Sequence, residues 1–316
     1  MTISQEIQQK LICPLTKSNL RLAGDYMENV DNPSLRYPVV NGIPVLINEE
    51  NSLFSIEDFS KNVNTTFDLK EAAIRKIIKK YMPKITHNLK AKENYRQLIK
   101  TLPANSKILV IGGSIKGLGT EEIYAHKSFE IIGADVTYGP CTNIICDAHD
   151  IPFQNESFDC IIVQAVLEHV LDPQRCVSEI HRVLKSGGIV YAETPFMQQV
   201  HMRQYDYTRY THLGHRRLFR NFDEIKSGPC GGPGMSLAWS YTWFLRSFAT
   251  SAPMVYALIF FGYITSFFLK YFDYYLIDKP GSYDAASFFF FLGRKADHLL
   301  PDRELINQFN GIKNAF

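Results

Sequence analysis

A short apolar run followed by glycines, at residues 107–119 (KILVIGGSIKGLG), restricts the possible folds of this chain more than any other feature. The residues before the glycines are isoleucine, leucine and valine, which is the composition of a buried parallel strand. The glycines allow a sharp turn that a ligand can approach closely, and residues 120–127 (TEEIYAHK) then read as a helix. This order predicts free backbone N–H groups at a helix N-terminus, where anionic groups of ligands bind.

Polar residues follow the next apolar runs along the chain. Asp135 comes near the end of residues 131–136 (IIGADV), about twenty residues after the glycines, where a carboxylate can accept hydrogen bonds from both hydroxyls of a ribose. Asp147 and Gln164 each follow a further apolar run. Because the carboxyl ends of parallel strands meet at one edge of a sheet, this spacing predicts an α/β fold whose polar strand ends line a crevice.

The motifs between residues 107 and 196 together resemble the class I S-adenosylmethionine-dependent methyltransferases, in the branch often labelled type 11. They are VIGGSIKGLG, GADV, CDAHDIPFQNESFDCIIVQAVLEHVLDP and EIHRVLKSGGIVYAETPF, in the family's order and spacing. The resemblance covers residues 107–222 well and the rest of the chain less closely. It implies a Rossmann-like, seven-stranded methyltransferase sheet with helices on both faces, and S-adenosylmethionine as the cofactor.

The resemblance also implies which residues contact the cofactor. They belong to the glycine turn and to the strand ends that follow it: Gly112, Gly113, Ser114, Gly117, Asp135, Asp147, Ala148 and Gln164. Within this set the glycines would border the methionine part of the cofactor, and Asp135 would hold the ribose. Asp147 with Ala148 would meet the adenine edge, and Gln164 would lie near the sulfonium.

The glycine turn departs from the common form of the family. Val110 takes the place of an acidic residue, Ser114 replaces the second glycine, and the last glycine of the motif is either Gly117 or Gly119. These departures leave open a second function, a non-catalytic binding module that keeps the fold and recruits partners through residues 1–50. An NAD-linked dehydrogenase also uses an acidic residue after its second strand, but LEHVLDP followed by RVLKSGG has no counterpart in that class.

The segment at residues 196–219 is rich in side chains suited to chemistry or recognition. It follows a strand predicted at residues 189–193, so it emerges at the same sheet edge as the glycine turn. Its pattern H-x-x-x-x-D-Y-x-R-x-T resembles a subset of the type 11 enzymes. We expect this loop to cover the acceptor pocket, with Asp206, Tyr207 and Arg209 binding the acceptor.

Two histidines are candidates for the catalytic base. Methyl transfer to oxygen or nitrogen requires an aligned acceptor and a group that takes its proton. His201 is the first candidate, and His169, in VLEHV, is the second. His212 and His215 have no evident third ligand, so no metal is predicted and both are expected at the surface.

Residues 11–46 form a small predicted β unit. The Asn41-Gly42 dipeptide favours a tight hairpin. C-P-x-x at its start and Y-P-V-x-x-G-I-P-V-L at its end resemble the zinc-ribbon-like domain of the methyltransferase-activator family. Thr16 stands where a second metal cysteine would be, so no zinc is expected beside Cys13. The unit is interpreted either as a cap that binds a partner or gates the substrate, or as a plain N-terminal extension.

Composition limits the cellular compartments and the partners that the sequence predicts. The 316 residues are 46% hydrophobic and 21% charged, and a net charge of +2 provides no field that would attract nucleic acid. The six cysteines contain no C-x-x-C pair, which favours buried thiols in a reducing cytoplasm. The first residues, MTISQEIQQK, lack the order of a signal peptide. The sequence therefore predicts a cytoplasmic protein without a nucleic-acid partner and leaves the oligomeric state undetermined.

Two stretches point to membrane contact. Residues 247–269 contain no charged side chain and approach the length of a bilayer span, and residues 69–82 have the pattern of a basic amphipathic helix. A strand predicted within residues 285–295 follows, so a single span would leave that strand on the wrong side of the membrane. Three alternatives stay open: an interfacial helix or hairpin that holds the protein at the inner face of the membrane, burial of the apolar stretch against the domain, or a membrane span.

The predicted organisation has three parts. A small ribbon-like β module covers residues 1–50, a helical linker covers residues 51–104, and a methyltransferase domain covers residues 105–316 with a hydrophobic helical insertion at about 235–283. The predicted acceptor is a small molecule, a glycan or a lipid-linked molecule, methylated at oxygen.

Overall fold

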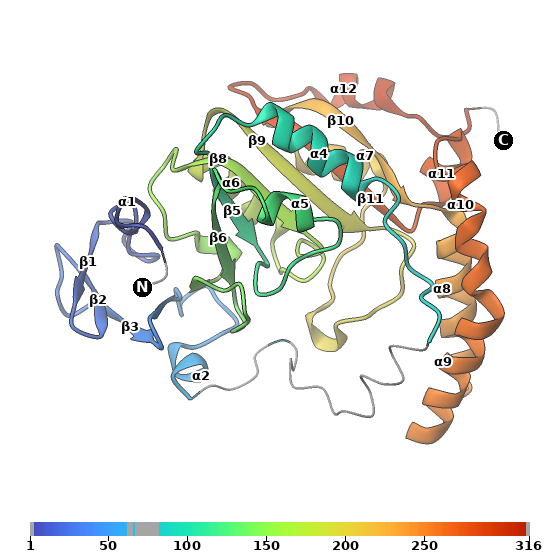
Figure 1. Cartoon of the computed structure of the whole chain (residues 1–316), viewed down its shortest axis with the longest axis horizontal. Helices are drawn as coiled ribbons and strands as arrows, with labels where there is room; N and C mark the ends of the chain where they lie inside the picture. Colours follow the sequence, from blue (N-terminus) through green and yellow to red (C-terminus); the bar gives the residue numbers. More distant parts are fainter. Residues whose placement is uncertain (1–2, 62–65, 67–81, 314–316) are drawn as a thin grey trace.

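The computed structural model describes residues 3–61, 66 and 82–313. Within these residues an eleven-stranded sheet runs through the molecule in the order β1-β2-β3-β4-β7-β6-β5-β8-β9-β11-β10 (Figure 1). The strands are β1 Leu20–Ala23, β2 Tyr26–Asn29, β3 Arg36–Val40, β4 Ile43–Leu46, β5 Lys107–Ile111, β6 Glu130–Asp135, β7 Ile144–Cys146, β8 Phe158–Gln164, β9 Leu184–Pro195, β10 Phe222–Gly231 and β11 Phe288–Lys295.

Helices cover the sheet and extend beyond it. The α-helices are α1 Gln5–Gln8, α2 Ile56–Ser60, α4 Ala91–Thr101, α5 Glu121–Tyr124, α6 Pro173–Val183, α7 His212–Leu218, α8 Pro233–Arg246, α9 Ala252–Ser266, α10 Asp273–Leu276, α11 Pro280–Ala285 and α12 Asp302–Leu305. The 3-10 helices are η1 Ala148–Asp150, η2 Arg203–Tyr205, η3 Phe267–Tyr271 and η4 Ile306–Gln308. The predicted basic helix at residues 69–82 lies outside the described residues, apart from Met82.

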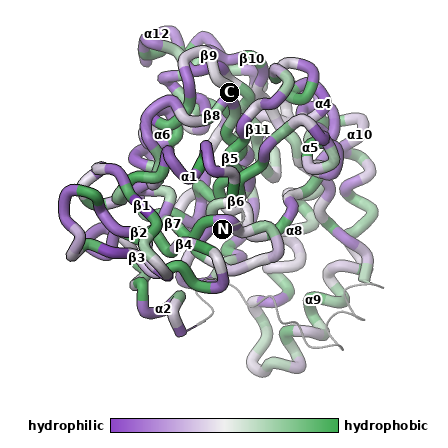
Figure 2. The backbone as a smooth tube through the Cα atoms, turned by 60° about the vertical axis from the view of Figure 1, so that its left-hand side comes forward, coloured by the Kyte–Doolittle hydropathy of each residue, from purple (hydrophilic) through white to green (hydrophobic). Residues whose placement is uncertain are grey.

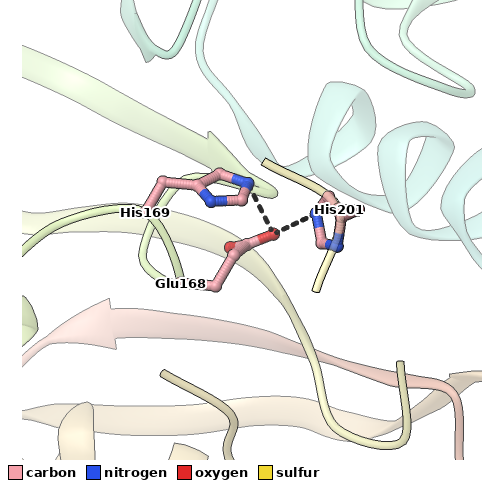
Figure 3. A group of neighbouring side chains, drawn as sticks. All are labelled: Glu168, His169 and His201. Atoms are coloured by element: carbon pink, nitrogen blue, oxygen red, sulfur yellow. Dashed lines mark ion pairs between the residues drawn. The ribbon is translucent and has the colours of Figure 1, made fainter. Parts of the chain in front are cut away.

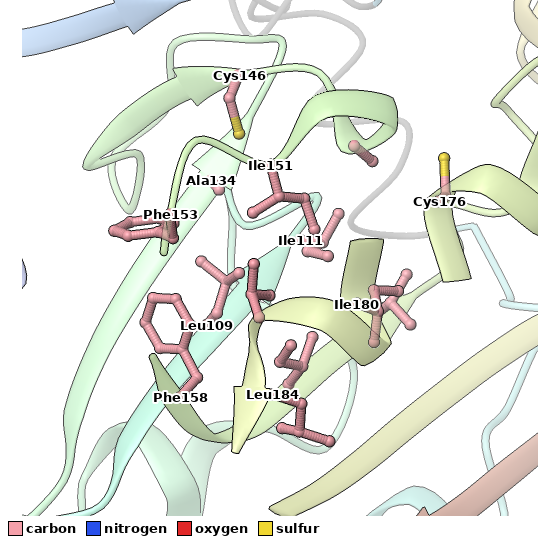
Figure 4. Packing of buried hydrophobic residues seen from close by; sticks show 14 of the residues in the cluster. Leu109, Ile111, Ala134, Cys146, Ile151, Phe153, Phe158, Cys176, Ile180 and Leu184 are labelled. Carbon is pink, nitrogen blue, oxygen red and sulfur yellow. The ribbon is translucent and has the colours of Figure 1, made fainter. Parts of the chain in front are cut away.

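The strands from β7 to β10 form the seven-stranded sheet that the sequence predicts. The strands β7, β6, β5, β8 and β9 are parallel, whereas β11 is antiparallel to both β9 and β10. Side chains of β5 alternate between two cores. Leu109 packs in the cluster that contains Ile180 of α6 (Figure 4). Ile108 packs in a second cluster, which contains Leu98 of α4. A strand segment that is buried on both faces must be apolar, as residues 108–111 of β5 and residues 160–163 of β8 are. The predicted α/β fold is confirmed.

The N-terminal strands continue this sheet. The strands β1 to β4 pair antiparallel, with a turn at Asn41-Gly42 as predicted, and β4 then pairs in parallel with β7. In this unit the Sγ atom of Cys13 lies 3.2 Å from the hydroxyl of Tyr37 and accepts a hydrogen bond from the backbone N–H of Thr16 at 3.4 Å. Because β4 pairs with β7, the N-terminal unit is joined to the central sheet by backbone hydrogen bonds as well as by its covalent connection.

The helix α7 contradicts one expectation. His212 and His215 are 6% and 2% exposed, so the surface positions expected for them are wrong. The helix begins after Thr211, whose hydroxyl accepts a hydrogen bond from the N–H of Gly214, and it turns both histidines inward. His215 Nε2 lies 3.1 Å from the hydroxyl of Thr194, and His212 Nε2 lies 2.9 Å from the hydroxyl of Ser227.

The helices α8 and α9 project from the sheet between β10 and β11 (Figure 1). We call this pair the α8–α9 hairpin. Gly262 allows the close approach of the two helices, since a Cβ atom there would lie 2.9 Å from the hydroxyl oxygen of Thr242. In Figure 2 the hydrophobic colour runs through the central strands and reappears along the hairpin.

The hairpin leaves its apolar side chains uncovered. Its exposed large hydrophobic residues are Leu237, Phe244, Phe248, Met254, Tyr256, Phe260, Phe261 and Ile264. Among the described residues, one helical stretch, Ala252–Leu276, is long and apolar enough to cross a membrane by length and composition, with 11% of its most apolar window buried. Among the alternatives for this stretch, burial against the domain is not what the structure shows.

Candidate functional site

The glycine turn after β5 brings several chain segments into close contact. Gly112 has φ +71°, and a Cβ atom there would lie 2.3 Å from the side chain of Val166. A Cβ atom at Gly117 would lie 1.8 Å from the side-chain oxygen of Gln164. Gly112 therefore requires glycine, through its positive φ and its contact with Val166, whereas a side chain at Gly117 would displace the flexible end of Gln164. The turn packs directly on the end of β8 and on Val166 just after it.

Asp135 joins this turn to the end of β6. Its carboxylate accepts a hydrogen bond of 2.9 Å from the backbone N–H of Ser114. Burial raises the pKa of Asp135, and the bond from Ser114 opposes that rise. Ser114 replaces a glycine of the family motif. Its backbone N–H fixes the position of the Asp135 carboxylate, which is predicted to hold a ribose.

A cavity of about 90 Å³ lies beside Asp135. Asp147, Ala148 and Gly112 also line it, and Phe54 from the segment between β4 and α2 contributes to its wall. The small cavity therefore brings together residues predicted to meet the adenosine half of the cofactor.

Both carboxylate oxygens of Asp147 already have protein partners. Oδ1 accepts a 3.0 Å hydrogen bond from the N–H of His149 and lies 2.5 Å from its Nδ1, while Oδ2 accepts from the hydroxyl of Ser52 at 2.6 Å. Burial raises the pKa of Asp147, but the bonds from His149 and Ser52 outweigh it and hold the pKa below its usual value. A cofactor that binds this carboxylate has to share an oxygen with these groups.

A second cavity, of about 480 Å³, adjoins the first, because Ile111 and Gly112 line both. Predicted cofactor residues line it on one side: Gly112, Ser114, Gly117 and Gln164. His201, Glu168, Glu193 and Trp239 are among its other lining residues. Gly113 lines neither cavity, since its own surroundings are backbone, with a built Cβ 2.6 Å from the carbonyl oxygen of Val110.

Glu193 is a buried acid that the sequence analysis missed. Its carboxylate accepts hydrogen bonds from the hydroxyl of Tyr191 at 2.5 Å, from Gln164 at 2.8 Å and from Asn88 at 2.8 and 2.9 Å. Burial raises its pKa, against the effect of these three donors. Its position in YAETPF, as the acid that ends the apolar run at residues 189–193, was the available signal.

A cluster of Glu168, His169 and His201 lies where the two cavities approach each other (Figure 3). The Oε1 atom of Glu168 lies 3.6 Å from Nε2 of His169 and 3.9 Å from Nε2 of His201. Burial raises the pKa of Glu168 to about 8 and lowers the pKa of His169 to about 4. The structure thus brings the two predicted bases together around an acid that was overlooked within VLEHV.

The side chains predicted to bind the acceptor hold the loop together. Asp206 forms an ion pair with Arg209 and accepts a 2.8 Å bond from the N–H of His201. Although burial favours its protonated form, the bonds from Arg209 and His201 keep the pKa of Asp206 well below its usual range. Arg209 also donates to the carbonyl of Gln198 at 2.8 Å, and Tyr207 is 43% exposed. None of the three lines either cavity, and their role in acceptor binding stays a prediction.

Residues 117–192 match a family model described as a methyltransferase domain. Over these residues the chain is therefore similar to a methyltransferase domain. The match covers the strands β6 to β8, the helix α6 and most of β9, together with Glu168 and His169 of the cluster. It does not include the N-terminal module, whose resemblance to a zinc-ribbon-like domain stays a prediction.

Curated relatives match short parts of the chain. An uncharacterized protein of Methanocaldococcus jannaschii is 42% identical over 45 residues, which are 14% of this chain and 22% of that protein. A demethylmenaquinone methyltransferase of Clavibacter sepedonicus is 43% identical over 42 residues, which are 13% of this chain and 17% of that protein. The chain thus spans no more than about a fifth of the length of these relatives.

Solved structures align over a longer part. The structure of a putative sarcosine dimethylglycine methyltransferase from Galdieria sulphuraria is 15% identical and has a TM-score of 0.43. The alignment covers 65% of this chain and 84% of that chain.

Proposed function

We propose that this chain transfers a methyl group from S-adenosylmethionine to a hydroxyl oxygen of an acceptor held in the larger cavity. The main observation in support is the pair of adjoining cavities, which meet at Gly112. The smaller one is bordered by two strand-end carboxylates, those of Asp135 and Asp147, and the larger one by His201. This arrangement provides separate spaces for a nucleoside-like group and for an acceptor within a methyltransferase domain.

The residues around the glycine turn fit the cofactor. Asp135 ends β6 next to the smaller cavity, where a carboxylate suits the two hydroxyls of a ribose. The side-chain oxygen of Gln164 is buried without a hydrogen-bond partner in the described residues, and Gln164 lines the larger cavity. When bound, the cofactor supplies an electrophilic methyl group on a positively charged sulfur, and a buried acceptor oxygen such as this one suits its ammonium group or its sulfonium.

The acceptor requires a group that removes the proton of its hydroxyl. His201 lines the larger cavity, whereas His169 lines the smaller one, so His201 is the better placed of the two predicted bases. Burial lowers the pKa of His201, which leaves its imidazole neutral and able to accept a proton at neutral pH. The loop ion pair of Asp206 and Arg209 positions His201 through its backbone N–H.

The acceptor class that we propose is lipid-linked. Trp239 of α8 lines the larger cavity, and the exposed apolar side chains of the hairpin begin at the neighbouring Leu237. A helix that is apolar on all sides belongs either in a protein core or in a lipid phase, and α9 is mostly exposed. A hairpin embedded at the inner face of the membrane would hold the acceptor cavity next to the lipid surface.

Isothermal titration with S-adenosylhomocysteine tests the proposed function. The purified chain is expected to bind one equivalent, and radiolabelled methyl groups are expected to appear in a lipid extract incubated with it. Failure to bind would overturn the proposal. Binding without any transfer would favour the non-catalytic module, which the valine and serine substitutions in the glycine turn support.

A further inference from the structure

The carboxylate of Glu168 lacks the partners that a buried acid needs. Glu168 is 0% exposed, and neither of its carboxylate oxygens accepts a hydrogen bond from another residue in the described part of the chain. A buried charge without a partner costs several kcal/mol, so such groups are paired, neutralised by a proton or bound to a metal. What lies next to this carboxylate therefore decides its state.

The atoms next to it are imidazole nitrogens that carry lone pairs. Nδ1 of His169 lies 2.7 Å from the carbonyl oxygen of Tyr205, and Nδ1 of His201 lies 3.2 Å from the carbonyl oxygen of Gln199. A carbonyl only accepts, so each Nδ1 carries the hydrogen of a neutral ring. Each Nε2 atom then turns a lone pair toward Glu168, and no donor stands between them.

We propose that Glu168, His169 and His201 bind a divalent transition-metal cation such as Mn²⁺, Fe²⁺ or Zn²⁺. One carboxylate oxygen and two imidazole nitrogens form a ligand set that these ions accept. In the described part of the chain, the three ligand atoms of this group lie within 4.8 Å of one another. Ligands of a bound ion lie roughly 3 to 3.5 Å apart, so closure of the widest separation by at most about 1.3 to 1.8 Å completes the site.

The surroundings hold the ligands in the required orientation. Histidines that bind metals usually donate their second N–H to a carbonyl or a carboxylate, which fixes the ring. His169 has the carbonyl of Tyr205 for this purpose, and His201 has that of Gln199 together with the carboxylate of Asp206, 3.4 Å from its Nδ1. The cation would offset the buried charge of Glu168.

The position of the site gives the cation a role that rests on the proposed function. Glu168 and His201 line the larger cavity, so open coordination positions face the acceptor. A hydroxyl bound there would release its proton to solvent water, and the resulting alkoxide oxygen would form the new bond to the methyl carbon as the carbon–sulfur bond breaks. In this state His201 is a ligand, and the cation replaces it as the group that activates the acceptor.

The test uses the full chain stripped with a chelator and titrated with Mn²⁺, followed by calorimetry and by the loss of the free-ion paramagnetic resonance signal. We expect one equivalent to bind and to raise the melting temperature. Glu168→Gln and His201→Gln are expected to weaken binding at least tenfold, whereas His298→Ala, a surface histidine with 68% side-chain exposure, retains it.

Each other outcome has a defined meaning. Wild-type chain that binds no Mn²⁺ and no Zn²⁺ overturns the cation site, and Glu168 then carries a proton. A stoichiometric metal that is lost on Cys13→Ser places the ion in the N-terminal module and also overturns it. Titration of Glu168→Gln with S-adenosylhomocysteine is run in parallel, because retained cofactor binding separates a failure of this site from a failure of the proposed function.

Discussion

At the scale of single residues, Asp135 and Asp147 end neighbouring strands but are held differently. Asp135 accepts backbone bonds from Ser114, Val136 and Thr137, yet burial still raises its pKa, whereas the bonds from Ser52 and His149 hold the pKa of Asp147 below its usual value. A cofactor gains more from a carboxylate whose charge the protein stabilises less. The two acids are therefore expected to contribute unequally.

Asparagine substitutions measure this difference. Asp135→Asn is expected to weaken S-adenosylhomocysteine binding about tenfold to a hundredfold, because a buried charged hydrogen-bond acceptor is worth roughly 1.5 to 3 kcal/mol. Asp147→Asn is expected to have a smaller effect in the same calorimetric titration. Asp297→Asn, at an exposed acid that lines neither cavity, serves as the control. Wild-type affinity in both strand-end variants would rule out the predicted cofactor contacts.

His215 makes the stability of the fold depend on pH. Burial, followed by the nearby charge of His212, lowers its pKa to about 3, so protonation favours the unfolded chain. The stabilisation is complete above the unfolded pKa of about 6.5 and is lost as the pH falls toward the folded value. Urea titrations should show that His215→Gln loses about 1 kcal/mol less than wild type between pH 7 and about 5.5. His298→Gln is the control, and an equal loss in all three proteins would refute the assignment.

The residue scale also shows what sequence patterns can reveal. The order of apolar runs indicates which acids end strands, so Asp135 and Asp147 could be predicted from the sequence. Histidines in a polar loop are candidates for catalysis by residue type alone. Glu168 and Glu193 were not predicted, because a single acid within an apolar run gives no sign of whether it is buried or solvated. Their importance depends on contacts with His201 and Asn88, which lie far along the chain.

At the scale of elements, local signals mark the start of α6 but do not reveal the burial of α7. Asp172 precedes α6 and Pro173 begins it, and the carboxylate of Asp172 accepts a bond from the N–H of Arg175. The helix ends at Val183, and β9 begins with Leu184. The sequence of α7, HLGHRRL, looks solvated, but tertiary packing buries His215 against the ring of Phe291.

The hairpin carries a prediction of its own. Replacing Phe260 and Phe261 by serine is expected to lower liposome binding more than tenfold, because each buried phenylalanine contributes roughly 1.5 to 3 kcal/mol of transfer free energy. Flotation on liposomes rich in phosphatidylglycerol measures this, with Leu299→Ser, another exposed apolar residue, as the control. Wild-type chain that stays at the bottom of the gradient and is monodisperse without detergent would contradict membrane binding.

Cations near the base of the hairpin favour an anionic surface. Lys270 lies over the ring of Tyr271, and Lys279 over the ring of Tyr275, at 5.3 and 4.8 Å from the ring centroids. Aromatic rings with nearby lysines are typical of the boundary between lipid and water. Raising the salt concentration should therefore reduce the advantage of anionic over neutral liposomes, since each basic residue near the surface adds about 1 kcal/mol that salt screens.

At the scale of the whole molecule, the N-terminal module is part of the main sheet. The pairs Val45 with Ile145 and Leu46 with Cys146 join β4 to β7, and Leu46 is fully buried in the core that also contains Leu109. The sequence predicted the strands and the Asn-Gly turn from local signals. It did not predict the pairing with β7, because the contact joins segments separated by the helical linker and two strands.

This pairing makes the module necessary for the stability of the domain. Leu46→Ala is expected to lower the free energy of unfolding by about 2 to 5 kcal/mol, as buried leucines do when a cavity forms. Leu22→Ala on β1, where the leucine is 47% exposed, should change it by less than about 0.5 kcal/mol. Urea unfolding followed by circular dichroism measures both. Equal small effects would show that the module folds independently of the sheet.

The placement of the hairpin between β10 and β11 also sets an order of events during synthesis. The described partner of β10 is β11, which leaves the ribosome only after the hairpin. The sheet therefore cannot close until the apolar helices have already been exposed to their surroundings. Phe288 of β11 lines the larger cavity, so the space for the acceptor forms last. If the hairpin enters a lipid surface, as we propose, it would do so before the acceptor cavity is complete.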